Sequence, residues 1–347
     1  MEKKFLNYIK DPQTSAELMF FSFNEENDNI ISGILVNKEL LTAYPILNGV
    51  PVMLPSAFPL EFVNHYKKEL QTINEQFNNK LSFEGTKDFW SFSAEWDYHF
   101  ANAVNTTWGW TVDDRFEQFL LETQTRKNEL GDKLIMDAGC GNGVLTEYIS
   151  SFSGLTFGVD LSDSVFFAEK NRKSKNVCFI KGNLLMLPFA DGTIDIIVSN
   201  GVIHHMPSTE KTFYSLSDAV KQGGKLYIWL YSNKGNLKWR IKRKFFDIAR
   251  VIVCRLNKKT QKVIVSMFTF VLKAMNKNID KNELNINMYD SLTPRWRHYH
   301  TPEEIAQWYY KAGFGPICLT HFDNKYGFGA YAVKEKADKT PGENYGK

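Results

Sequence analysis

The chain has 347 residues, of which 43% are hydrophobic and 23% charged, and its formal net charge is +3. This composition supplies enough apolar surface for one large domain and a small one. No stretch reaches about 18 apolar residues, which excludes a membrane-spanning helix. The four cysteines lie far apart without a Cys-x-x-Cys pair, so we expect neither a zinc site nor a disulfide framework, and no metal.

Residues 1–56 are predicted to form a small β-rich unit. Apolar residues alternate over 17–23 and 30–36, as in short strands, and the stretch 44–54 closes the unit. Within that stretch Asn48-Gly49 is a strong turn signal between two short strands. The start of the chain lacks the apolar region of a signal peptide, so a cytoplasmic location is expected.

Residues 57–130 are predicted to connect this unit to the rest of the chain. Apolar residues recur at helical spacing over 62–77, and a second helix is expected from Asp113 through Leu121. The aromatic residues between the two helices either fold over a ligand or pack the N-terminal unit against a sheet. They are Trp90, Trp96, Tyr98, Phe100, Trp108 and Trp110.

The stretch 134–143, Leu-Ile-Met-Asp-Ala-Gly-Cys-Gly-Asn-Gly, is predicted to join a buried strand to the helix over 144–149. Such a glycine turn lines a cleft with backbone at the carboxyl end of a sheet. Glycine is needed there because a Cβ would block either the turn or the close approach of a ligand. A dinucleotide fold would need a further glycine at position 144, where the chain has valine.

Further strands are predicted downstream in a regular order. The strand over 156–160 ends in Asp160, whose carboxylate can accept both hydroxyls of a ribose. The next strands are expected over 177–182, with a turn at Gly182-Asn183, and over 193–199. A helix, a Gly-Gly turn and a fifth strand ending at Trp229 complete the series.

The pattern D-x-G-x-G-x-G over 137–143 and the order of these elements resemble the class I S-adenosylmethionine-dependent methyltransferases of type 11. The resemblance implies an α/β fold with a seven-stranded Rossmann-like sheet over 131–333, and S-adenosylmethionine as the cofactor. Asn183 departs from the acid usual in the family, although its amide oxygen can still accept a hydrogen bond. The residues implied for cofactor binding are Arg115, Asp137, Ala138, Gly139, Cys140, Gly141, Gly143, Asp160, Leu161, Gly182, Asn183, Leu184 and Asn200.

The closing stretch of the N-terminal unit, Tyr-Pro-Ile-Leu-Asn-Gly-Val-Pro-Val-Met-Leu, resembles the small zinc-ribbon-like domain that accompanies or activates several methyltransferases. Zinc-binding relatives open with Cys-Pro, where this chain has Asp11-Pro12, and no cysteine occurs before Cys140. The resemblance therefore implies a zinc-free docking or scaffolding module.

Residues 234–287 are predicted to be a basic helical insert after the fifth strand. The stretch 234–262 contains eleven Lys and Arg residues and one acid, which gives a net charge of +10. It either lies on an anionic membrane surface, binds nucleic acid through phosphates, or forms a lid whose apolar face packs over the cleft. One apolar helical face is expected to hold Leu237, Ile241, Phe245, Ile248, Ile252 and Leu256.

The C-terminal part is predicted to return to the sheet. A helix opens with Thr301 as its cap and Pro302 at its first position, and it stops at Gly313. The stretches 316–320 and 329–333 are expected to form an antiparallel hairpin. The polar tail 334–347 is expected to be disordered.

His204 and His205 follow the fourth strand, where the resemblance places the acceptor pocket. A neutral imidazole titrates near working pH, so His205 first and His204 second are candidate general bases. Alternatively, both line the cleft and bond to the backbone. A second polar cluster over 295–300 either faces the same pocket or lies on a surface loop; its members are Arg295, Arg297, His298, Tyr299 and His300.

The resemblance and the insert together predict methyl transfer to a small-molecule, lipid- or sugar-linked acceptor, at a hydroxyl oxygen. One alternative is an RNA methyltransferase, although the strand end Ser-Asn-Gly-Val over 199–202 lacks the Asn/Asp-Pro-Pro-Tyr motif of base methylation. Another is a cofactor-binding partner protein without catalysis, which Asn183 prompts. The expected location is cytoplasmic, with peripheral contact to the inner membrane face through 234–262 as one option.

Overall fold

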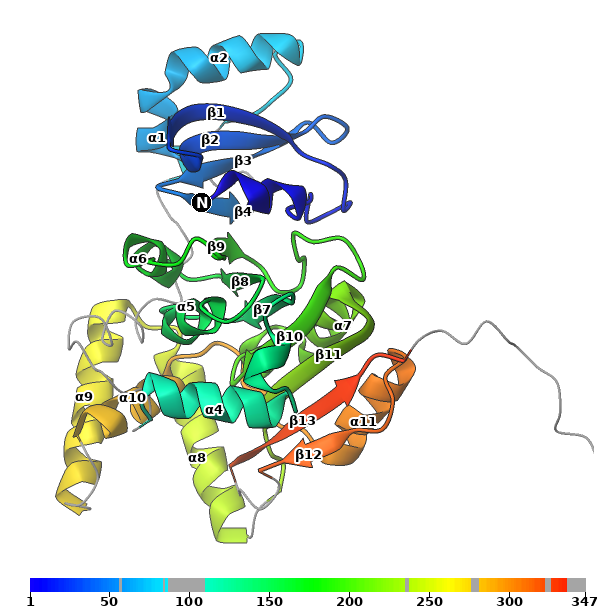
Figure 1. The fold of residues 1–347 in the computed structure, drawn as a ribbon. Helices are drawn as coiled ribbons and strands as arrows, with labels where there is room; N and C mark the ends of the chain where they lie inside the picture. The colour runs from blue at the N-terminus through cyan, green and yellow to red at the C-terminus, as the bar shows by residue number, and fades with distance from the viewer. Residues whose placement is uncertain are drawn as a thin grey trace, which may run out of the picture.

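The computed structural model describes residues 1–55, 58–83, 85–86, 110–234, 237–275, 281–321 and 326–335. Its centre is an 11-stranded sheet in the order β1-β2-β3-β4-β9-β8-β7-β10-β11-β13-β12 (Figure 1). Helices cover both faces of this sheet. The α/β class that the sequence predicts is therefore confirmed.

Seven strands make up the part of the sheet that the glycine motif predicts. All of them run parallel except β13, which is antiparallel to both of its neighbours. The carboxyl ends of β7, β8, β9, β10 and β11 consequently meet at one edge. The bounds are β7 Leu134–Ala138, β8 Leu155–Asp160, β9 Val177–Gly182, β10 Ile194–Asn200, β11 Val220–Tyr231, β12 Cys318–Thr320 and β13 Gly327–Val333.

Four N-terminal strands extend the same sheet, so it has eleven strands where the sequence predicted seven and a separate β-rich unit. β4 pairs in parallel with β9 through Val52 opposite Lys181, which protects the edge that β9 would otherwise expose. Asn48 and Gly49 have φ of 49° and 82°, as the predicted turn requires. The bounds are β1 Met19–Glu26, β2 Asn29–Asn37, β3 Thr42–Leu47 and β4 Val50–Met53.

Asp11, which stands where zinc-binding relatives have cysteine, is buried and holds parts of the N-terminal unit together through hydrogen bonds. Its carboxylate accepts the hydroxyl of Tyr44 at 2.9 Å and the backbone N–H groups of Gln13 and Thr14, each at 2.9 Å. The described residues contain no group of three or more metal-binding side chains. The ribbon-like origin of this unit stays a prediction.

The helices form two layers on the central sheet. On one face lie α4 (Val112–Glu122), α5 (Val144–Ser150) and α6 (Ser164–Lys170). The other face is covered by η1 (Lys3–Asn7), α7 (Thr209–Ala219) and α11 (Pro302–Lys311). Thr301 accepts the N–H of Glu304 and caps α11, as predicted. The helices α1 (Leu60–His65) and α2 (Lys67–Gln76) pack on the N-terminal strands, with the short pair β5 (Phe58–Pro59) and β6 (Gly85–Thr86) beside them.

The insert forms three helices beside the sheet: α8 (Leu237–Val253), α9 (Lys258–Met275) and α10 (Lys281–Leu292) (Figure 1). They share a small core of their own, to which α10 contributes most. The predicted end of the insert at 287 falls inside α10. The helix continues to Leu292 because Met288, Tyr289 and Leu292 are part of this core. Across the described ranges, no helix is long and apolar enough to cross a bilayer.

Two predictions fall largely outside the described residues. Of the aromatic cluster, only Trp110 is described, and it is exposed. The expected C-terminal tail is described only for residues 334–335, where Lys334 donates to the carbonyl oxygens of Ser217 and Val220. The first residue of that tail is therefore held against α7 and β11.

Candidate active site

The cofactor loop, residues 137–143, lies between β7 and α5 and is shaped by its glycines. Gly139, Gly141 and Gly143 all have positive φ, of 89°, 54° and 71°. A Cβ on Gly139 would lie 2.3 Å from the Val202 side chain, and one on Gly143 would lie 2.5 Å from the Phe179 ring. Both positions therefore require glycine for space as well as for backbone conformation.

Asp160, at the carboxyl end of β8, fastens this loop. One carboxylate oxygen accepts the N–H of Gly141 at 2.9 Å, and the other accepts the N–H and hydroxyl of Ser162 at 2.8 and 2.7 Å. The side chain stays half-buried at the sheet edge. These three bonds leave one lone-pair site of the carboxylate free, which can accept a ribose hydroxyl beside the backbone-lined turn. This arrangement fits the nucleoside and amino-acid parts of S-adenosylmethionine.

Asp137 is buried below the loop and accepts the hydroxyl of Thr146 at 2.6 Å. Burial raises the pKa of Asp137, although the Thr146 hydroxyl and the charge of Arg115 act in the opposite direction. Burial lowers the pKa of Arg115, while Asp137 and Glu122 raise it. Arg115, on α4, thus lies within electrostatic reach of the loop, and its predicted contact with the cofactor carboxylate stays a prediction.

The other predicted cofactor residues line the same edge or support it. Asn183 follows β9 and accepts the N–H of Leu185 at 3.0 Å, which leaves one lone pair and the amide N–H groups. Asn200, at the end of β10, is exposed. Burial raises the pKa of the Cys140 thiol, so this cysteine contributes backbone rather than a reactive sulfur. Ala138, Gly182 and Leu184 are buried, and Leu161 is half-buried.

A second group of side chains, which we call the acceptor wall, stands beyond the ends of β10 and β11. It consists of His205, Tyr231, Asp290 and Arg297. His205 Nε2 lies 3.1 Å from Asp290 Oδ1, and its Nδ1 lies 3.0 Å from the carbonyl oxygen of Trp296. The Nε2 contact is a close approach to the carboxylate without an aligned hydrogen bond.

Asp290 is held as a carboxylate by the rest of the wall. Burial alone would raise its pKa, but His205, Arg297 and the donating hydroxyl of Tyr231 together hold the pKa well below its ordinary value. The Arg297 guanidinium also lies 4.4 Å from the centre of the Tyr231 ring. The wall is therefore a compact arrangement of one carboxylate, one phenol and two potential cations.

His204 differs sharply from its neighbour. Its ring is fully buried, 4.1 Å from the centre of the Tyr231 ring, and neither ring nitrogen has a hydrogen-bond partner among the described residues. Burial lowers the pKa of His204 well below its ordinary value. It therefore lines the wall as a neutral ring, which favours His205 as the proton acceptor.

The predicted polar cluster over 295–300 lies beside these histidines. The N–H of His298 donates to the carbonyl oxygen of His204 at 2.9 Å, and His298 Nε2 lies 3.1 Å from that of Met206. Tyr299 donates to Asp247 on α8 at 3.2 Å. His300 turns away, because its ring bonds to Thr209 and Glu304. Arg295 is exposed, so the cluster divides between the wall and its surroundings.

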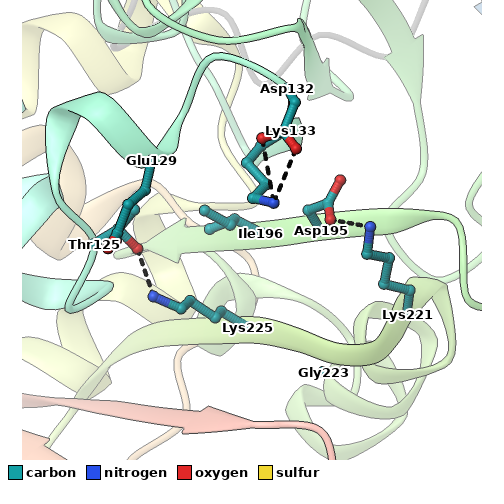
Figure 2. A pocket seen from close by; sticks show the side chains of 9 residues that line it. All are labelled: Thr125, Glu129, Asp132, Lys133, Asp195, Ile196, Lys221, Gly223 and Lys225. Carbon is teal, nitrogen blue, oxygen red and sulfur yellow. Dashed lines mark hydrogen bonds and ion pairs between the residues drawn. The ribbon is translucent and has the colours of Figure 1, made fainter.

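A hollow of about 440 Å³ lies at the opposite edge of the sheet, where β7, β10 and β11 begin (Figure 2). Its lysines already have partners, because Lys221 pairs with Asp195, Lys133 with Asp132, and Lys225 donates to Thr125 at 2.8 Å. This hollow is remote from the cofactor loop and from His205. We therefore place the chemistry at the carboxyl edge, where parallel sheets bind their ligands.

Comparison with known proteins agrees with this geometry. Residues 136–228 match the family model for a methyltransferase domain. A sterol 24-C-methyltransferase of Pneumocystis carinii is 27% identical over 156 residues, which cover 42% of this chain and 40% of that protein. A ubiquinone biosynthesis O-methyltransferase of Coxiella burnetii is 28% identical over 101 residues, covering 28% and 43%. The chain thus spans less than half the length of these two relatives.

Among solved structures, a putative S-adenosylmethionine-dependent methyltransferase of Listeria monocytogenes is similar at 14% identity. The match covers 64% of this chain and 99% of that one, with a TM-score of 0.41. The strand order and the matched family model define the class, an α/β methyltransferase fold. The chain contains a class I S-adenosylmethionine-dependent methyltransferase domain, and S-adenosylmethionine is its cofactor.

Sequence reasoning missed Tyr231 and Asp290 as parts of the site. Tyr231 ends β11 two residues beyond the predicted strand, and Asp290 lies on α10 beyond the predicted end of the helical insert at 287. The one available signal was an acid placed shortly before a run of arginine and histidine residues. Nothing in its spacing pointed to His205.

Proposed function

We propose that the protein transfers a methyl group from S-adenosylmethionine to a hydroxyl oxygen of a small-molecule, lipid- or sugar-linked acceptor. His205 is the general base, and Asp290 stabilises the imidazolium that forms. The observation that carries this proposal is the 3.1 Å contact between His205 Nε2 and Asp290 Oδ1, at the edge of the sheet that holds the cofactor loop.

The backbone sets which nitrogen of His205 acts. Nδ1 faces the carbonyl oxygen of Trp296 at 3.0 Å and can satisfy it only as an N–H donor. The neutral ring then carries its lone pair on Nε2, which makes no aligned hydrogen bond within the described residues. Nε2 takes the hydroxyl proton as the oxygen gains its new bond to carbon.

Asp290 acts on the charge that this proton transfer creates. Its lowered pKa keeps the carboxylate ionised at neutral pH, so a negative charge stands ready beside Nε2. When bound, the cofactor would supply a methyl group on a sulfonium sulfur, which leaves as a neutral thioether when the carbon–sulfur bond breaks. The residues of the wall therefore need only to orient the hydroxyl and to accept its proton.

Two features support an oxygen acceptor over the alternatives. A positioned base matters most for a hydroxyl, which must lose a proton as it reacts. The similar proteins named above include an O-methyltransferase of ubiquinone biosynthesis. A partner protein without catalysis would have no use for an ionised carboxylate held beside a histidine in a buried site.

The test is the substitution His205→Gln, measured as S-adenosylhomocysteine release with a panel of phenolic and aliphatic alcohols. We expect kcat to fall about 10²- to 10⁴-fold, the usual contribution of a general base. Calorimetry should find the affinity for S-adenosylmethionine unchanged, because His205 lies outside the cofactor loop. Wild-type kcat in the variant would remove the proposed base.

The matched control is His298→Gln, which changes a neighbouring histidine that contacts a backbone carbonyl. We expect it to keep most of the activity. The pH profile separates the two variants further, because only the loss of a titrating base removes the acid limb of kcat/KM.

A further inference from the structure

The apolar face of α8 that the sequence predicts points to solvent. Between 59% and 62% of each of Ile241, Phe245, Ile248 and Ile252 is exposed. These residues recur every three or four positions and so form one line along the helix. The lid interpretation required this face to pack over the cleft, and the structure contradicts it. The inward side of α8 is instead a different set of residues, which includes Phe246, Ala249 and Val253.

The next helix carries a second exposed apolar line. Val263, Met267, Phe270 and Val271 on α9 are between 54% and 74% exposed. The two helices touch through Phe246 and Phe268, whose ring centres lie 6.3 Å apart. We call the eight exposed residues of α8 and α9 the apolar stripe. A soluble surface seldom carries so many large apolar side chains on neighbouring helices.

Basic residues accompany the apolar stripe. Lys244 and Arg255 on and after α8, and Lys259 and Lys262 on α9, are all exposed. The one acid of the segment, Asp247, faces inward, where Tyr299 donates to it and Arg250 lies 3.7 Å away. The outer surface of these helices is consequently apolar and cationic together. That combination complements an anionic lipid surface, whose headgroups are negative and whose interior is hydrocarbon.

The inward side of α8 contacts the segment 294–299, which adjoins the acceptor wall. Arg250 of α8 is buried and donates to the carbonyl oxygens of Pro294 and Arg295, next to the Trp296 carbonyl that faces His205. Arg243 lies 4.2 Å from the centre of the Tyr299 ring. Asp290 itself belongs to α10, which packs against both α8 and α9. One side of the insert therefore builds the wall while the other is exposed.

We propose that the apolar stripe docks on an anionic bilayer, with α8 and α9 lying in the headgroup layer, and that the acceptor is a hydroxylated lipid taken from that bilayer. The statement about the acceptor rests on the proposed function, whereas the docking does not. Nucleic acid is a poorer occupant, because apolar side chains offer nothing to phosphates and only Phe245 and Phe270 of the eight could stack on bases.

The test is flotation of the full chain with vesicles of phosphatidylcholine alone or mixed equally with phosphatidylglycerol. We expect the protein to float with the mixed vesicles and to stay in solution with the neutral ones. The paired variants Phe245→Glu/Ile252→Glu and Met267→Glu/Phe270→Glu change exposed residues of α8 and α9, and each pair should reduce the floated fraction at least fivefold. Tyr310→Glu is the matched control, because Tyr310 is 82% exposed on α11, which is not part of the insert, and this variant should float like the wild type.

Three outcomes would overturn the docking. The first is a wild type that floats with neither vesicle, and the second is equal flotation with both. The third is a wild-type dimer, seen by light scattering, that the paired variants convert to monomer without any flotation, because a second copy would then cover the apolar stripe. Calorimetric titration with S-adenosylmethionine should give wild-type affinity in every variant. That measurement and the His205→Gln assay thus distinguish failed docking from a failed proposed function.

Discussion

The cofactor loop and the acceptor wall lie at the same edge of one sheet, yet they are built in opposite ways. The loop comes from seven consecutive residues, 137–143, held by the carboxylate of Asp160 one strand away. The wall joins His205 to Asp290, which lies 85 positions later in the chain on a different helix. The loop, built from neighbouring residues, fixes how a common cofactor is bound. The wall, built from residues far apart in the chain, can vary with the acceptor.

At Gly139 the loop passes the side chain of Val202, which lies three residues before His205 of the wall. The largest expected effect is at this contact. Gly139→Ala adds a Cβ 2.3 Å from Val202 at a φ of 89°, so both strain and overlap destabilise the fold. We expect the free energy of unfolding to fall by about 3–5 kcal/mol, measured by urea denaturation.

Gly223→Ala is the matched control for that substitution. Gly223 also has a positive φ, of 78°, but a Cβ there would meet no atom within 4 Å. Its cost is therefore backbone strain alone, about 1 kcal/mol. Equal losses in the two variants would show that the loop does not lie in close contact with Val202 at Gly139.

Asp160 tests whether the loop binds the cofactor independently of the wall. Asp160→Ala removes the acceptor for the ribose hydroxyls and for the N–H of Gly141, so we expect the affinity for S-adenosylmethionine to fall about hundredfold. Asp160→Asn keeps one acceptor oxygen and should lose about tenfold. Calorimetric titration measures both, with the exposed Asp191→Ala as control. Unchanged affinity in Asp160→Ala would refute the predicted ribose contact.

The same contrast explains what the sequence could predict. The strand ends at Asp137 and Asp160 could be placed because the apolar runs, acids and glycines that define them are neighbours in the chain. The eleven-stranded sheet could not, because the pairing of β4 with β9 depends on how two distant segments meet. Periodicity correctly identified the apolar line on α8, but it cannot show whether such a line faces protein or solvent. That depends on α10, whose sequence has little helical periodicity of its own.

A smaller effect, on kcat, is expected from Asp290 of the acceptor wall. Asp290→Asn keeps the shape of the side chain and removes the charge beside His205 Nε2. Stabilisation of the imidazolium then weakens, and we expect kcat to fall about tenfold, which corresponds to about 1.4 kcal/mol in the transition state. The affinity for S-adenosylmethionine should not change, which separates the wall from the loop. A loss of cofactor affinity equal to the loss in kcat would mean that the two regions are one unit.

The smallest effect concerns His204, the buried neighbour of His205, and the pH dependence of stability. Burial holds the pKa of His204 well below 6.5. Below pH 6.5 this side chain therefore binds a proton in the unfolded chain but stays neutral in the folded protein. Stability due to this residue is thus complete above pH 6.5 and declines as the pH falls, by at most about 1.4 kcal/mol per pH unit for one proton. His204→Phe keeps a ring against Tyr231 and should flatten the fall in Tm between pH 7 and 5. His300, whose pKa burial also lowers, retains part of the slope. The control is His65→Phe, at an exposed position, which should leave the change of Tm with pH as in the wild type. If His204→Phe gave the same change of Tm with pH as this control, the His204 ring would be protonated in the folded protein.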